Sequence, residues 1–394
     1  MTGDTKSVQQ RAAAAQKAIA SRHLRRLGGW VPFTRIGGVA WPRPGRPLSR
    51  TRLTASWNLW WQAHLVDLLV DGFHHRHEDH VGVTAARLLR SIWLRNGFRW
   101  TNQYYDDMAW LGLAAERLDR IVPPELDPDH SRAIGTLTST MLDAWRPDIG
   151  GGIPWRTTDT FFNAPANGPA AILLARTGHG ERAVETADWI DHELRLPSGL
   201  IADGRWVRAN GETELDDAVF TYCQGVALGA EVEAHRLTGD RRHLDRIDSL
   251  LTAVTAEMTT DGVIRGAGGG DGGLFAGILA RYLALVATDL PADAPGAGEL
   301  RDRAARPVLA SADAAWSNRA VDADGLPLFG ASWDVPARLP DGRGPAARKV
   351  GGAVASSRVP ERDLSVQVSA GILLEAAVAI TTGSTEHIGS ATPD

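Results

Sequence analysis

Two adjacent carboxylates are the residues of this sequence best suited to chemistry. Asp106 and Asp107 lie in an otherwise apolar and aromatic segment from Tyr104 to Ala114. Its spacing predicts a helix that is apolar around most of its circumference, and such a helix is expected to be buried. Burying an unpaired carboxylate is costly or shifts its pKa. The pair therefore either caps a helix N-terminus or forms a site, and spacing alone does not decide between the two.

Other polar side chains in apolar surroundings allow the same two interpretations. Asn163 and Asn167 are four residues apart, on one face of a predicted helix, and their amides need hydrogen-bond partners. Helix capping or contacts between helices would satisfy them, and so would a ligand rich in hydroxyl groups. A second acidic pair, Asp216-Asp217, follows other acidic residues and is typical of a negatively charged helix start, so it ranks behind the first pair.

Four sequence elements resemble glycoside hydrolase family 76, the endo-α-1,6-mannanases, and occur in the family's order between about residues 50 and 382. They are Tyr105-Asp106-Asp107-Met108-Ala109-Trp110; Gly151-Gly152-Ile153-Pro154-Trp155 with Asn163-Ala164 and Asn167-Gly168-Pro169; Phe220-Thr221-Tyr222-Cys223-Gln224-Gly225; and Asp271-Gly272-Gly273-Leu274-Phe275-Ala276-Gly277. One element alone would be a weak signal, whereas four in order are a strong one. Cys223 stands where the family often has Asn, which puts a substrate contact there in doubt.

The resemblance implies a hydrolase of α-1,6-linked mannosides, with α-mannan or manno-oligosaccharides as substrate. It implies Asp106 as nucleophile and Asp107 as general acid/base. Because two adjacent carboxyl groups on one helix leave little room for a water, we expect retention of configuration through an aspartyl glycosyl-enzyme. We expect neither a cofactor nor a metal, because no cluster with ligand spacing lies near the pair. The candidate substrate-binding residues are Trp57, Asn58, Tyr105, Trp155, Asn163, Asn167, Tyr222, Gln224, Asp271 and Phe275.

Two other classes of function stay open. One is a different sugar enzyme on the same kind of ring: a transglycosylase, an epimerase or an unsaturated glucuronyl hydrolase. Epimerases of this kind use His as acid and base, and the four elements contain no His. The other class is a non-catalytic carbohydrate-binding protein, against which the intact Asp106 and Asp107 argue.

The elements that position these residues are predicted to be helical throughout. Counted from Val8, about twelve helices alternate between more apolar and more amphipathic members. The pattern predicts an all-α (α/α)6 toroid with one small β-hairpin at Pro197–Arg208. We expect an N-terminal helix and Pro/Gly-rich loop at 1–50 packed on the ring, a single catalytic domain at 51–382 and a flexible tail at 383–394. Two long connections, 262–273 and 323–362, are expected to line a site.

Composition limits the partners. The chain has 394 residues and a net charge of −5, which gives no general basic field for nucleic acid. We expect no membrane span, because no stretch approaches the roughly 18–20 apolar residues that one needs. A cytoplasmic location is expected, because Met1–Lys17 does not resemble a secretory signal and the single cysteine, Cys223, cannot form an internal disulfide. The oligomeric state stays open. Fourteen Trp against eight Phe and four Tyr favour a carbohydrate cleft without locating it.

Overall fold

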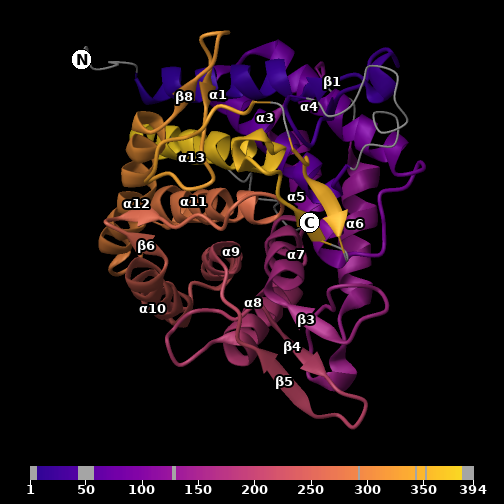
Figure 1. Ribbon diagram of the computed structural model, residues 1–394. Helices are drawn as coiled ribbons and strands as arrows, with labels where there is room; N and C mark the ends of the chain where they lie inside the picture. Colours follow the sequence, from indigo (N-terminus) through magenta and orange to yellow (C-terminus); the bar gives the residue numbers. More distant parts are fainter. Residues whose placement is uncertain are drawn as a thin grey trace.

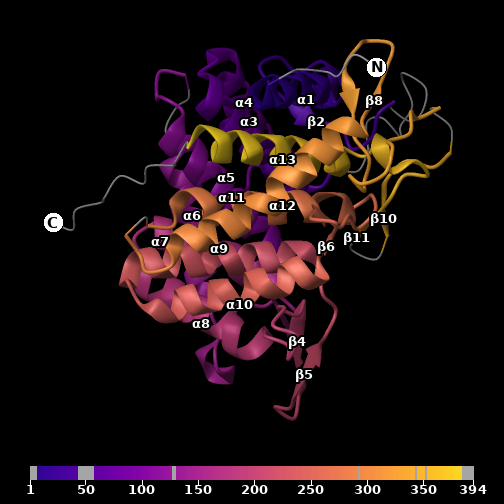
Figure 2. The ribbon, with the colours of Figure 1, turned by 90° about the vertical axis from the view of Figure 1, so that its left-hand side faces the viewer.

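A computed structural model describes residues 7–42, 57–126, 130–291, 293–341, 344–350 and 353–383. These residues form twelve α-helices arranged as inner and outer members of six pairs (Figures 1 and 2). The inner helices are α3 (Leu59–Arg76), α5 (Tyr105–Ile121), α7 (Ala164–Arg176), α9 (Thr221–Thr238), α11 (Gly272–Asp289) and α13 (Leu364–Thr382). Each packs against the next, and α13 packs against α3, which closes the ring. The expected (α/α)6 toroid is thereby confirmed.

The outer helices cover the ring. They are α4 (Asp79–Arg95), α6 (Ser131–Ala144), α8 (Gly180–Leu194), α10 (Arg241–Glu257), α12 (Ala297–Ser317) and α1 (Val8–Arg22). The helix α1 lies beside α13 and supplies the outer member of the sixth pair, so this part of the segment 1–50 belongs to the ring (Figures 1 and 2). Of the segment 383–394, only Gly383 belongs to the described residues.

The burial of each helix follows its sequence pattern. Along α10 the buried residues recur at helical spacing, as in Leu244, Ile247 and Leu251, which leaves the opposite face polar. By contrast, α13 is buried at every position from Leu364 to Val378. Close packing of α11 on α13 depends on Gly277, where a Cβ atom would lie 2.7 Å from the Cα of Ser369.

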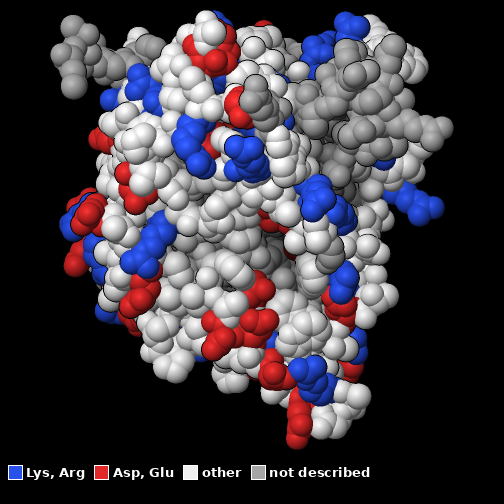
Figure 3. Space-filling model, in the orientation of Figure 1, with Lys and Arg blue, Asp and Glu red and all other residues white. Residues whose placement is uncertain are grey.

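Two inner helices have the length and composition of a membrane span, contrary to the sequence-based expectation. They are α11 and α13, which are 72% and 83% buried over the most apolar window. Core helices of a toroid have this composition because neighbours surround them on all sides. On the face shown in Figure 3, basic and acidic side chains of the described residues are interspersed.

Strands are short and lie between the helices. The largest sheet is antiparallel and contains β3 (Phe161–Asn163), β4 (Gly204–Val207) and β5 (Thr213–Asp216). The hairpin is therefore at 204–216 and not at 197–208, because the tight turn that Ser198-Gly199 supports joins Arg195 to Ile201 through a single bridge. Asp216 consequently ends a strand instead of starting a helix.

Further strands form four two-stranded pairs, more than the one hairpin expected. These are β1 (Leu24–Arg25) with β2 (Ile36–Gly37), β6 (Thr259–Thr260) with β7 (Val263–Ile264), β8 (Ala320–Val321) with β9 (Pro327–Leu328), and β10 (Arg348–Val350) with β11 (Ala353–Ala355). Short 3₁₀ helices occupy Leu27–Gly29, Pro147–Ile149 and Pro360–Arg362.

Candidate active site

A cleft of about 590 Å³ opens where five of the inner helices begin. Its lining comes from the first turns or N-caps of α3, α5, α7, α9 and α11, from the β10–β11 hairpin and from the segments that connect the helices. The lining residues used below are Trp57, Asn58, Trp60, Asn96, Asn102, Tyr104, Asp106, Asp107, Trp155, Asn163, Asp203, Tyr222, Asp271, Phe275, Lys349 and Val354. Helix N-termini carry partial positive charge, which favours carboxylates in this position.

Asp106 and Asp107 lie in the first turn of α5 and have different hydrogen-bond partners. Oδ1 of Asp106 accepts the backbone N–H of Asp107 at 2.8 Å, and Oδ2 accepts the indole N–H of Trp155 at 3.0 Å. Oδ2 of Asp107 accepts the side-chain amide of Asn102 at 2.6 Å. The pair therefore occupies both positions that the sequence allowed, a helix start and a cleft wall, and the two carboxylates are held separately.

The surroundings raise the pKa of both carboxyl groups. Burial raises the pKa of Asp106 well above its usual value, the charge of Asp107 adds to the effect, and the two N–H donors offset only part of it. Burial raises the pKa of Asp107 to about 6, although the Asn102 amide and the Lys349 ammonium lower it. Close carboxylates titrate as a pair, so this pair retains a proton into the range just below neutral pH.

Two more carboxylates face the cleft. Asp271 accepts the indole N–H of Trp61 at 3.0 Å and the backbone N–H of Val354 at 2.6 Å, and burial raises its pKa. Asp203 lies beside the first turn of α9, and burial raises its pKa to about 6. Four carboxylates thus share one partly desolvated cleft, a setting in which raised pKa values are expected.

The position where the family often has Asn is occupied by a buried thiol. The Sγ of Cys223 lies 3.5 Å from Oδ1 of Asp203 and donates to it, as the hydroxyl of Tyr222 does at 3.4 Å. Burial and the Asp203 charge raise the pKa of the Cys223 thiol well above its usual value. A protonated buried thiol is a poor nucleophile, so Cys223 acts as a packed donor to Asp203.

Aromatic rings form the walls. The rings of Tyr222 and Phe275 stack with centroids 4.0 Å apart and planes 9° apart. Trp155 lies next to Tyr104, with ring centroids 5.6 Å apart. The ammonium of Lys349 lies 5.2 Å from the centroid of the Tyr104 ring. Flat apolar faces bordered by hydrogen-bonding groups are the surfaces that pyranose rings pack against.

The structure brings most of the candidate residues to this cleft. Those that line it are Trp57, Asn58, Asp106, Asp107, Trp155, Asn163, Tyr222, Asp271 and Phe275. Asn163 also caps α7, since its Oδ1 accepts the backbone N–H of Ala166 at 3.3 Å. Asn163 therefore has both of the roles that the sequence presented as alternatives: it caps a helix and it lines the cleft.

Three candidates do not line the cleft. Asn167 is fully buried, and its amide exchanges two hydrogen bonds with the backbone of Ile153, each 2.8 Å long. Gln224 is also fully buried and does the same with Ile201, at 2.7 and 2.8 Å. The structure does not bring these two amides to the cleft, because backbone groups already satisfy them. These hydrogen bonds hold the segments that contain Ile153 and Ile201 against the inner helices α7 and α9.

The third correction concerns the tyrosines before the carboxylate pair. The ring of Tyr104, not that of Tyr105, lines the cleft. An isolated bridge between Tyr104 and Arg156 precedes the helix, and α5 begins at Tyr105. The change from extended to helical backbone between the two residues turns the Tyr105 side chain away, towards Arg146 and Asp143.

Several residues of the cleft were not predicted. Lys349 and Val354 belong to the long segment 323–362, whose length was the signal for a site-lining connection. Asp203 lies within the segment Pro197–Arg208, for which the sequence predicts only a hairpin. For Asn102 the sequence carries no signal, because its role depends on the tertiary position of Asp107.

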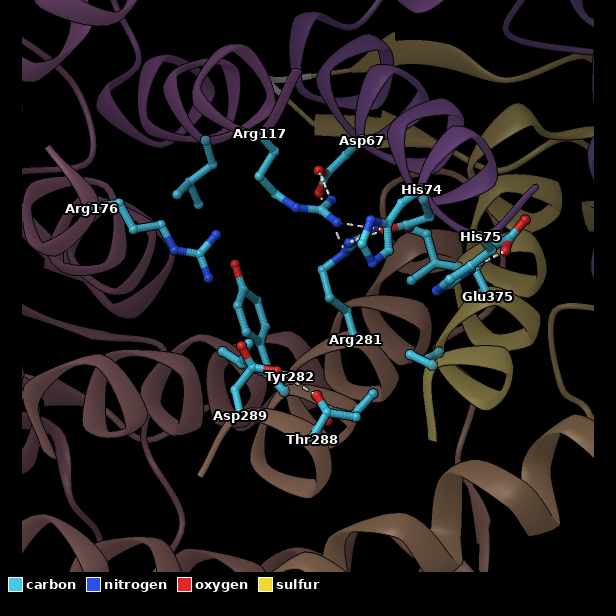
Figure 4. Close-up of a pocket in the computed structure, with 17 residues that line it drawn as sticks. Asp67, His74, His75, Arg117, Arg176, Arg281, Tyr282, Thr288, Asp289 and Glu375 are labelled. Carbon is cyan, nitrogen blue, oxygen red and sulfur yellow. Dashed lines mark hydrogen bonds and ion pairs between the residues drawn. The ribbon is translucent and has the colours of Figure 1, made fainter. Parts of the chain in front are cut away.

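A second cavity, of about 70 Å³, lies between the carboxyl-terminal halves of the inner helices (Figure 4). Arg117 and Arg281 converge there on Asp67 and Asp71, with N–O distances of 2.6 Å from each arginine to Asp71. Arg176 pairs with Glu233 at 2.7 Å. A cavity this small is below the usual size of ligand sites, and its buried charges are compensated by each other, so it is a structural network.

The imidazoles have structural roles as well. His64 is buried against the Trp60 and Trp110 rings, and burial together with Arg281 lowers its pKa to about 3, so it is neutral. His75 pairs with Glu375 at 2.8 Å. Among the described residues, no group of His, Cys, Asp or Glu has a geometry that could hold a metal ion.

A ring of six helix pairs with a carboxylate pair in an aromatic cleft is the architecture of a carbohydrate-active enzyme. The family model for glycosyl hydrolase family 76 matches residues 36–340. The chain therefore belongs to glycosyl hydrolase family 76 and is a glycoside hydrolase. Among curated proteins there is no match.

Solved structures agree with this assignment. The α-1,6-mannanase GH76A of Salegentibacter sp. HEL1_6 is 28% identical, with a TM-score of 0.74, over 95% of this chain and 100% of that one. An inactive variant of it, with two consecutive aspartates changed to asparagine and in complex with α-1,6-mannotriose, is 27% identical, with a TM-score of 0.75 over the same shares. The Lin0763 protein of Listeria innocua shares the fold at 24% identity and a TM-score of 0.75, over 97% of this chain and all of that one.

Proposed function

We propose that this glycoside hydrolase cleaves α-1,6-linked mannosides with retention of configuration. The observation that carries the proposal is the adjacent pair Asp106 and Asp107, held by different donors at the wall of an aromatic cleft. Retaining glycosidases need two carboxyl groups close together, at about 5–5.5 Å, whereas inverting enzymes leave room for a water between them. Neighbouring residues in one helical turn favour the closer arrangement.

In the proposed reaction Asp106 attacks the anomeric carbon while Asp107 gives its proton to the leaving oxygen. A covalent mannosyl ester forms on Asp106, and the glycosidic C–O bond breaks. Asp107, now ionised, then removes a proton from a water molecule, whose oxygen attacks the same carbon. The ester opens, Asp106 returns as a carboxylate, and Asp107 is protonated again.

The assignment of the two roles follows the hydrogen bonds. Asp106 accepts two N–H donors, which fix the orientation of its carboxylate and favour the ionised form. Burial raises the pKa of both carboxyl groups, and their mutual repulsion lets the pair retain one proton more readily than two separate carboxylates would. That proton is shared by the pair, and the positive charge that develops on the sugar favours the ionised form at the attacking group, Asp106.

The solved relatives support the choice of substrate and residues. Replacement of two consecutive aspartates, by asparagine or by alanine, gave inactive variants of the Salegentibacter α-1,6-mannanase. Those variants were obtained in complex with α-1,6-mannotriose and α-1,6-mannotetrose. By analogy, the cleft of this chain is proposed to bind a linear α-1,6-mannoside, with Asp106 and Asp107 beside the bond to be cleaved.

Incubation with linear α-1,6-manno-oligosaccharides tests the proposal. Proton NMR of the first product, recorded before mutarotation, should show the α-anomer. Chelator treatment should leave the rate unchanged. An initial β-anomer would overturn the retaining mechanism, and failure to cleave any α-1,6-mannoside under conditions where the protein is folded would overturn the proposed substrate.

A further inference from the structure

An aromatic ledge lies beside the cleft, on the last turns of α4 and the chain segment that joins α4 to α5. It consists of the rings of Trp93, Phe98 and Trp100. The Trp93 ring meets the Phe98 ring edge-on at a centroid distance of 5.0 Å and lies 6.1 Å from the Trp100 ring at an angle of 30°. The side chain of Phe98 is 65% exposed. Three neighbouring aromatic rings with water-facing surfaces are unusual on a soluble protein and mark a contact site.

The ledge is continuous with the cleft. Asn96 and Asn102, which flank the segment that carries Phe98, both line the cleft. The guanidinium of Arg95, one residue earlier, lies 5.7 Å from the ring centroid of Trp57, another lining residue. Asn102 in turn donates to Asp107. A chain of sugar rings leaving the carboxylate pair in this direction would pass over the ledge.

The segment is held in a defined shape. Gly97 follows α4 with a φ of +70°, and the N–H of Phe98 donates to the carbonyl of Trp93 at 2.9 Å, as in a Schellman motif. The side-chain amide of Asn96 donates to the carbonyls of Arg99 and Thr101, at 2.8 and 3.1 Å. The ledge is thus preorganised, which lowers the entropic cost of binding on it.

The Schellman motif explains why Phe98 contacts Trp93, but it does not explain why the residue is aromatic and largely exposed. Schellman motifs commonly place an apolar residue where Phe98 contacts Trp93, and an aliphatic side chain would serve that contact. An aromatic ring that is still largely exposed, with its own φ at +60°, goes beyond this need. A bulky residue with positive φ is strained, and strain of this kind gathers at functional sites.

We propose that the ledge of Trp93, Phe98 and Trp100 is an outer binding site for mannan, on which sugar rings of a long chain stack outside the cleft. The inference rests on the proposed function and deepens it, because it assigns a binding role to three aromatic residues outside the cleft. Short oligosaccharides that fill only the cleft would not reach the ledge. The flat faces of the rings provide apolar contact with the C–H faces of pyranoses.

Binding to the inactive full-length chain tests the inference. In a background of Asp106→Asn with Asp107→Asn, calorimetry compares the affinity for linear α-1,6-mannan with that for α-1,6-mannotriose. Phe98→Ala and Trp93→Ala should each weaken mannan binding by about 3–10-fold, the worth of one aromatic contact, and leave mannotriose binding unchanged. Phe98→Leu keeps the apolar contact with Trp93 and should weaken mannan binding as well.

Trp30→Ala is the matched control, because Trp30 is 73% exposed and does not line the cleft; it should change neither affinity. Unchanged mannan binding in the Phe98 variants, or an equal loss for mannan and mannotriose, would overturn the ledge while leaving the proposed function in place. No binding of either sugar by the parent protein would overturn both.

Discussion

The indole N–H of Trp155 donates a 3.0 Å hydrogen bond to Oδ2 of Asp106, while the backbone carbonyl of Trp155 accepts the N–H of Tyr105 at 2.9 Å. One residue outside the helix therefore holds both the start of α5 and the carboxylate in its first turn. The Gly-Gly-Ile-Pro-Trp element and the Tyr-Asp-Asp element are two halves of one arrangement, which explains why both occur in the sequence.

Replacement of Trp155 by Phe should lower kcat more than it raises KM. Phenylalanine keeps an aromatic surface towards the sugar but removes the N–H that orients Asp106. A hydrogen bond to a charged group contributes about 1.5–3 kcal/mol, so kcat is expected to fall about 10–100-fold. Steady-state kinetics on α-1,6-manno-oligosaccharides decides this. A rise in KM at unchanged kcat would show that Trp155 serves only as a binding surface.

Asp106→Asn and Asp107→Asn should each reduce kcat by at least about 10²–10⁴-fold, the range of positioned acid–base groups, without unfolding the protein. Asp216→Asn is the control, because Asp216 ends β5 and accepts the N–H of Ala218 at 3.3 Å. It should retain near-normal turnover. Greater damage from Asp216→Asn at an unchanged thermal midpoint would mean that the catalytic carboxylates lie elsewhere.

Asp107→Asn should also stabilise the fold near neutral pH. Because burial raises the pKa of Asp107 to about 6, the folded protein binds more protons than the unfolded chain between about pH 4 and 6. The free energy of unfolding therefore falls as pH rises through this window, and the loss persists above it. Asparagine cannot ionise, so the variant does not lose this free energy of unfolding. At pH 7 its Tm should therefore be about 2–6 °C higher than that of the parent protein.

The gain in Tm should shrink towards pH 4, where the carboxyl group of the folded protein is already protonated. Thermal unfolding followed by circular dichroism at the two pH values measures this, with Asp217→Asn as the control at an exposed position. An equal Tm change at both pH values would contradict a raised pKa at Asp107.

Asn167→Ala should lower the free energy of unfolding without changing how the folded protein binds its substrate. Its amide satisfies the N–H and C=O groups of Ile153, and leaving buried polar groups without partners costs about 1–3 kcal/mol. The KM of the folded fraction should be unchanged, as it should for Gln224→Ala. Denaturant unfolding together with kinetics separates the two quantities. A raised KM at unchanged stability would restore Asn167 to the substrate site.

The sequence predicts the fold better than it predicts the fine structure of the cleft. Inner and outer helices differ in how much of their circumference is apolar, and that difference is visible residue by residue, as in α13 and α10. The role of a polar residue depends instead on what reaches it from elsewhere. Asn163 and Asn167 are both asparagines at the start of α7. Asn163 lines the cleft, whereas the side chain of Asn167 is hydrogen-bonded to the backbone of Ile153.

Contacts made by distant loops were beyond the reach of sequence patterns. Asn102 donates to Asp107, and Val354 donates to Asp271 from 83 residues away. Neither contact follows from local spacing. The length of the segment 323–362 did indicate a site-lining connection, because a long structureless loop in a compact ring is usually functional. Which of its residues face the cleft was fixed only by the β10–β11 pairing.

The pairing of α1 with α13 has a consequence for how the protein is made. The sixth helix pair joins the first and last helices of the described chain, so this contact cannot form until α13 has left the ribosome. Contacts between distant parts of a chain slow folding. Until then the apolar flank of α1, with Ala12, Ala15 and Ile19, lacks the cover that α13 provides. We therefore expect nascent chains that lack α13 to depend on chaperones.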